Sequence, residues 1–178
     1  MNTSEVYDSD ATFDPLDMVE SILTEEGLDF ERTPEGDLGF ALSGDWRTYE
    51  MWFSWRPEGE CLQLCCALNV QGTGTTLAKE RLPGLYELLA VVNQHVWFGH
   101  FEVFRDVEVR DGGYDIVFRH TVAVMPQDRG SVASSAHMIN SAAEAVDRFF
   151  PAFDFWFKGA ISAQDAFAAC LFETRGEA

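Results

Sequence analysis

Two neighbouring stretches of the chain alternate between apolar side chains and small or polar ones, and no other feature constrains the fold as strongly. The apolar positions are Tyr49, Met51, Phe53 and Trp55 in the first stretch and Leu62, Leu64, Cys66, Leu68 and Val70 in the second. Side chains two residues apart lie on the same face of a strand, so the pattern predicts two strands that bury one face in a core. Trp52 falls on the opposite face of the first strand.

Turn signals and helical spacing predict the remaining elements. Residues 30–70 carry turn signals at 34–37, 43–45 and 56–59, and we expect three antiparallel strands there. A hairpin of 100–110 and 114–125 turns at 111–113. Helical spacing predicts helices at 14–27, at 82–97, from 131 onward and at 162–172. Pro151 is expected to kink or end the third helix, because a proline inside a helix removes a hydrogen bond. The predicted fold class is α+β, with an antiparallel sheet of about five strands and helices packed on it in the order α-β-β-β-α-β-β-α.

Length and composition predict one globular domain. The chain has 178 residues, 47% of them hydrophobic, which is enough to form a full core. We expect a flexible acidic tail at 1–13 and a single domain at 14–178. The chain has no apolar run near the roughly 20 residues of a membrane-spanning helix, and its first residues lack the pattern of a secretory signal. We therefore expect a cytoplasmic protein.

The net charge of −18 restricts the classes of partner. Proteins that bind nucleic acids or anionic membranes neutralise phosphates with Lys and Arg, so neither class of partner is expected. From Glu5 to Glu31 the chain carries ten acidic residues and no basic one. Such blocks are usually solvated faces or tails, but they can also recruit a basic partner or a metal cation.

Motifs for covalent catalysis and phosphate binding are absent. The chain has no G-x-S-x-G motif, and Gln71–Thr76 lacks the lysine spacing of a phosphate-binding loop. Cys61, Cys65 and Cys66 lack the spacing of zinc ligands, and Cys66 points to the strand face opposite Cys61 and Cys65. We therefore expect buried thiols, as for Cys170.

The histidines offer a weak alternative. His95 and His100 could join Glu102 in a metal site or an acid–base pair, but surface or capping roles explain them more simply. His120 lies on an apolar strand face, as a core histidine would, and His137 is isolated in the third helix. We expect no catalytic residues, no metal and no cofactor.

The pattern N-x-x-x-x-F/W-G-x-F stands at Asn93 to Phe101, where the second predicted helix meets the fourth strand. With the acidic helix 14–27, the strands 49–55 and 61–70 and the closing helix through Asp147, it resembles the YbjN family over roughly residues 14–157. The resemblance implies a fold like that of type III secretion chaperones, often dimeric, in bacterial proteins described as sensory transduction regulators. It implies no catalytic residues. The extended aromatic C-terminal segment departs from the family pattern.

Trp52, Phe155 and Trp156 are the candidate partner-binding residues. A sheet with one covered face should not expose such side chains without a use. We therefore predict a non-enzymatic, chaperone-like regulatory module that binds a protein partner or forms a homodimer. The alternatives are a small-molecule sensor or enzyme, with a pocket between the sheet and the long helix, and a dimer with a purely structural role. An apolar groove would favour the first hypothesis, and a closed pocket with histidines and carboxylates pointing inward would favour the sensor or enzyme.

Overall fold

The structure, a computed structural model, describes residues 14–70, 77, 79–106, 113–124, 132–159 and 161–173. Its strands are β1 (Phe30–Arg32), β2 (Leu38–Ser43), β3 (Thr48–Arg56), β4 (Cys61–Ala67), β5 (His100–Asp106) and β6 (Gly113–Ala123). Its helices are α1 (Pro15–Glu25), α2 (Leu82–Asn93), α3 (Val132–Lys158) and α4 (Ala163–Glu173), with two short 3₁₀ turns, η1 (Pro57–Gly59) and η2 (Lys79–Arg81). The predicted α+β class is confirmed.

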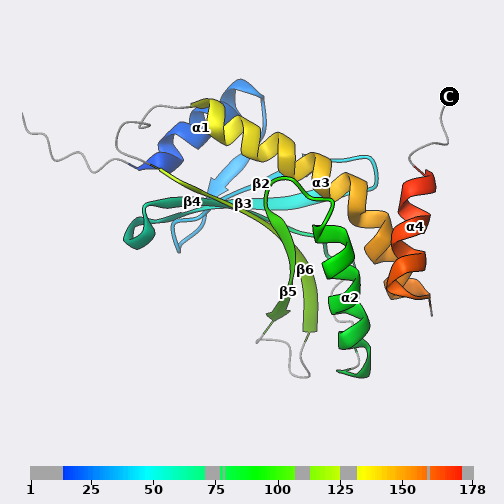
Figure 1. Ribbon diagram of the computed structural model, residues 1–178. Helices are drawn as coiled ribbons and strands as arrows, with labels where there is room; N and C mark the ends of the chain where they lie inside the picture. The colour runs from blue at the N-terminus through cyan, green and yellow to red at the C-terminus, as the bar shows by residue number, and fades with distance from the viewer. Residues whose placement is uncertain are drawn as a thin grey trace, which may run out of the picture.

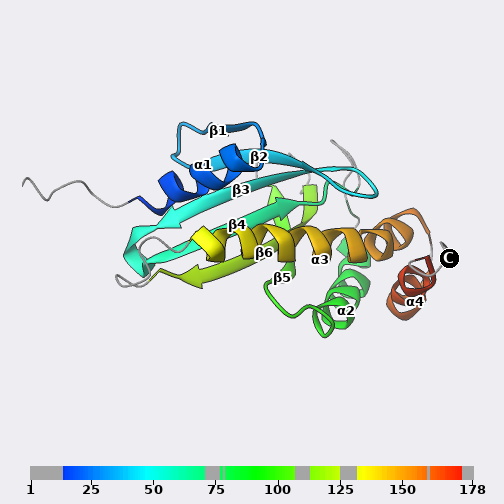
Figure 2. The same ribbon diagram turned by 90° about the horizontal axis from the view of Figure 1, so that it is seen from above.

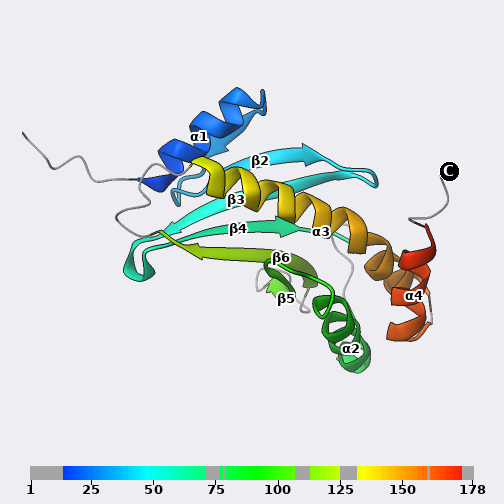
Figure 3. The ribbon, with the colours of Figure 1, turned by 45° about the horizontal axis from the view of Figure 1, so that its top comes forward.

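The six strands form one antiparallel sheet in the order β1-β2-β3-β4-β6-β5, most of which is visible in Figure 3. The sequence predicts about five strands because the run before Ser43 indicates a single strand. The turn signal at 34–37 instead divides that run into the hairpin of β1 and β2, with Gly36 at a φ of +89°. A residue without a Cβ adopts this left-handed conformation at little cost.

Helices α1 and α3 lie across one face of the sheet (Figure 2), and we call this the core face. The predicted alternation is confirmed: Tyr49, Met51 and Phe53 of β3 are almost fully buried beneath these helices. Helix α1 begins where expected, because the Asp14 carboxylate accepts a hydrogen bond from the Leu16 N–H at 2.9 Å. Over β1–β4 the opposite face carries no helix in the described part of the chain (Figure 1), and we call it the open face.

Helix α3 continues through Pro151 rather than ending there. A proline lacks the N–H that would bond the carbonyl four residues earlier, which here belongs to Asp147. The indole Nε1–H of Trp46 donates to that carbonyl at 3.0 Å instead. The Asp147 carboxylate also accepts the Asp45 N–H, at 3.1 Å. The β2–β3 turn is thereby joined to the middle of α3, and the hydrogen-bonding deficit left by Pro151 is filled.

Candidate functional site

The three aromatic residues singled out by the sequence lie in different environments. Trp52 is half-buried on the open face and Phe155 is half-buried on α3, so both keep part of their side chains at the surface. Trp156 is only 4% exposed, which corrects the expectation of a surface side chain. Arg81 lies over its ring at 4.2 Å and donates to its backbone carbonyl at 2.6 Å. Gly84 of α2 packs against the same ring. Helix α2 therefore covers the side of α3 that was expected to be exposed.

Among the described residues, the most exposed aromatic side chain lies elsewhere, in residues 94–99 between α2 and β5, which we call the aromatic loop. Trp97 is 92% exposed and its neighbour Phe98 is 50% exposed. The indole N–H of Trp97 has no hydrogen-bond partner, and no ring stacks on it, within the described residues. Helical spacing does not reveal the exposure of Trp97, because it predicts a second helix that extends to 97, whereas α2 ends at Asn93.

Asn93 and Gly99 set the conformation of the aromatic loop. The Asn93 side chain donates from Nδ2 to the Phe101 carbonyl at 2.9 Å and accepts the Phe101 N–H on Oδ1 at 2.8 Å. Gly99 has a φ of +75°, and a Cβ there would lie 2.6 Å from the Arg119 carbonyl oxygen. The pattern noted in the sequence is therefore structural: it bridges the two ends of a turn that leaves Trp97 exposed.

Ring contacts hold the loop on both sides of Trp97. The His95 ring stacks on Phe167 of α4, with centroids 4.7 Å apart. Phe98 meets the ring of His137 edge-on at 4.8 Å and stacks on His120 at 6.0 Å. Burial, reinforced by nearby His137, lowers the pKa of His120. Neutral His120 therefore acts as a core residue, as its place on the strand face predicted.

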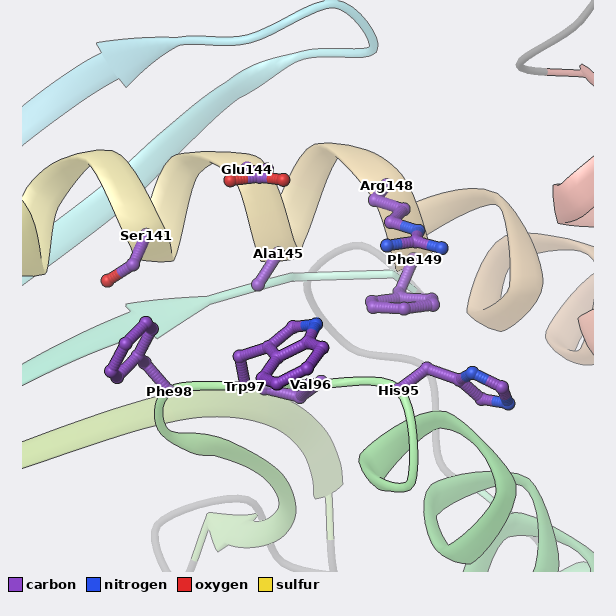
Figure 4. Close-up of a pocket in the computed structure, with 9 residues that line it drawn as sticks. All are labelled: His95, Val96, Trp97, Phe98, Ser141, Glu144, Ala145, Arg148 and Phe149. Atoms are coloured by element: carbon purple, nitrogen blue, oxygen red, sulfur yellow. The ribbon is translucent and has the colours of Figure 1, made fainter.

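A small cavity lies between the aromatic loop and α3, as Figure 4 shows. It is lined by His95, Val96, Trp97, Phe98, Ser141, Glu144, Ala145, Arg148 and Phe149. Its volume of about 50 Å³ is far smaller than the roughly 300–1,000 Å³ of typical ligand pockets. Space of this size admits a few water molecules or one inserted side-chain tip, but not a metabolite.

The residues considered for a metal site or an acid–base pair, His95, His100 and Glu102, do not all lie together. His100 and Glu102 lie on β5, with 3.6 Å between His100 Nε2 and the Glu102 carboxylate, while His95 stacks on α4. Glu102 also pairs with Arg119 at 2.5 Å, so its charge is already balanced. The described residues contain no group of three or more His, Cys, Asp or Glu side chains placed to hold a metal ion.

The cysteines are free thiols. Burial raises the pKa of Cys65 and of Cys170 to about 11, and that of Cys66 further, so these three remain protonated near neutral pH. Cys61 is half-buried at the start of β4. Among the described helices, none is long and apolar enough to cross a membrane.

Comparisons with known proteins agree with this fold. The family model described as "YbjN: Putative bacterial sensory transduction regulator" matches residues 15–155. A crystal structure described as "YbjN, a putative transcription regulator from E. coli" superposes with a TM-score of 0.52 at 11% sequence identity. The match covers 90% of this chain and 95% of that one. No curated protein sequence matches this chain. Because the family model spans most of its length, this chain belongs to the YbjN family.

Proposed function

We propose that this protein is a non-enzymatic, cytoplasmic regulatory module that binds a protein partner through its aromatic loop. The observation that carries the proposal is the 92% exposure of Trp97. A tryptophan left in water forgoes about 25 cal/mol for each Å² of apolar surface that a partner could cover. Tryptophan is also among the residues most enriched at the energetic centres of protein interfaces.

The fixed conformation of the loop supports the same proposal. The two Asn93 hydrogen bonds and the His95 and Phe98 ring contacts hold the residues on either side of Trp97. A preorganised contact residue loses little conformational entropy when a partner binds, which increases affinity. The adjoining cavity is suited to a side chain of the partner rather than to a separate ligand.

The size of that cavity weighs against the alternative of a small-molecule sensor or enzyme. The partner is either a different protein or a second copy of this chain. Trp52 and Phe155 remain proposed secondary contacts, because each keeps part of its side chain exposed. Trp156 is excluded from this role by its burial.

The test replaces Trp97 with Ala and uses Tyr86→Ala as the matched control. Tyr86 lies on α2 and is 56% exposed, so both variants remove one exposed aromatic side chain. Each immobilised protein captures partners from a lysate of its own cells, and Kd is then measured for any protein that the wild type enriches. Sedimentation velocity measures self-association in parallel.

We expect Trp97→Ala to weaken the captured complex or the self-association by about 2 kcal/mol, roughly 30-fold in Kd. Tyr86→Ala should bind like the wild type. Both variants should unfold in urea as the wild type does, because exposed side chains contribute little to the folded state. Equal capture and equal sedimentation by all three proteins would refute the aromatic loop as the binding surface.

A further inference from the structure

A groove runs over the open face of the sheet at its β1 edge, on the other side from the aromatic loop. Its volume is about 640 Å³, within the range of ligand sites. Its lining comes from Asp29, Phe30, Glu31, Thr33, Gly39, Phe40, Ala41, Glu50, Met51 and Trp52. The floor is low because β2 presents Gly39 and Ala41 to this face, in register with the larger Trp52 and Glu50 of β3.

The lining of the groove carries negative charge that no basic side chain in the lining balances. It includes three carboxylates, of Asp29, Glu31 and Glu50, and no Lys or Arg. All three are exposed, and none of them forms an ion pair or side-chain hydrogen bond within the described residues. Such a groove attracts positive charge, and the net charge of −18 strengthens the attraction over longer range.

The adjacent arginine does not neutralise the groove. Arg32 of β1 lies on the core face, where it pairs at 2.5–2.7 Å with Asp17 and Glu20 of α1 and with Asp14, the N-cap of that helix. Because successive strand residues point to opposite faces, Glu31 is left on the open side. The basic residue of β1 is therefore engaged by α1 and its N-cap rather than by the groove.

Trp52 adds a second, independent element of recognition. Its half-buried indole forms one wall of the groove, and no cation lies over it among the described residues. Lysine and arginine bind to tryptophan faces through cation–π attraction. An aromatic wall with carboxylates around it is suited to the head group of a basic side chain and also to its aliphatic stem.

We propose that this groove binds an extended, lysine- or arginine-bearing segment of a partner protein. The low floor over Gly39 and Ala41 leaves room for an extended backbone to lie between Trp52 and the carboxylates of β1. Basic side chains of such a segment then reach Trp52 and the carboxylates. The site does not depend on the aromatic loop, which lies on the α3 side of the sheet.

The test uses the full chain and three fluorescein-labelled hexapeptides, Lys-Val-Lys-Val-Lys-Val and its Gln and Glu counterparts, with binding followed by fluorescence anisotropy. The groove variants are Trp52→Ala and the double change Glu31→Gln with Glu50→Gln. The matched control, Glu25→Gln with Glu26→Gln, removes the same charge from exposed acids of the α1 end. A urea unfolding curve checks that each variant is folded.

We expect the Lys peptide alone to bind, and each groove variant to raise its Kd about tenfold, whereas the control should stay within about twofold. Trp97→Ala should leave peptide binding unchanged, which separates this site from the proposed function. Equal losses in the control and groove variants would overturn the inference in favour of diffuse charge attraction. Equal binding of the Gln peptide, or no binding of the Lys peptide, would also overturn it. So would a dimer that dissociates in Trp52→Ala, because the groove would then hold a second copy of this chain.

Discussion

Replacing Asn93 with Ala should destabilise the protein more than any other change to a polar residue around the aromatic loop. The side chain makes two hydrogen bonds to the backbone of Phe101, whose own side chain is only 2% exposed. Removing it leaves one N–H and one C=O without partners, and each such group costs about 1–3 kcal/mol when it is shielded from water. Allowing for partial access of water, we expect a loss of about 2–4 kcal/mol in the free energy of unfolding.

Equilibrium unfolding in urea, followed by circular dichroism, measures this loss. Gln94→Ala is the control, because the Gln94 side chain forms one exposed hydrogen bond within its own helix end. The control should change the free energy of unfolding by less than about 0.5 kcal/mol. For a chain of this size, the expected loss for Asn93→Ala lowers Tm by roughly 4–16 °C. A loss below about 0.5 kcal/mol, or equal losses in both variants, would refute the claim that Asn93 holds the loop.

Two further changes test the backbone and the buried histidine. Gly99→Ala should lower the free energy of unfolding by about 3 kcal/mol or more, because its Cβ would clash with backbone at 2.6 Å. The control Gly36→Ala, which has no atom within 4 Å, should cost only about 1 kcal/mol for its positive φ. Equal losses for the two variants in urea unfolding would contradict the clash at Gly99. His120 has a pKa lowered by burial, so the unfolded chain binds more protons and stability falls as the pH drops below about 6.5. His120→Gln should therefore show a shallower loss of unfolding free energy between pH of about 7.5 and 5.5, and a slope equal to that of the wild type would exclude this role.

Local patterns in the sequence were sufficient for the fold class and most of the core. The period-two runs placed Tyr49, Met51 and Phe53 on one buried face, and helical spacing predicted a helix from 131 onward, where α3 lies. Asp14 and Pro15 marked the start of α1 correctly. These features depend on neighbours within a few residues, because side-chain direction follows directly from strand and helix geometry. The resemblance through the Asn93–Phe101 pattern agreed with the family match.

The tertiary structure alone decided which aromatic side chains reach the surface. Trp156 and Trp97 both stand in apolar sequence, but α2 packs over Trp156, whereas the Asn93 bridge turns Trp97 outward. The groove beside Trp52 likewise depends on strand pairing, which sets Gly39 opposite Trp52 and directs Glu31 to the same face. Exposure is determined by elements distant in the sequence, so a local pattern predicts the face on which a side chain lies but not what covers it.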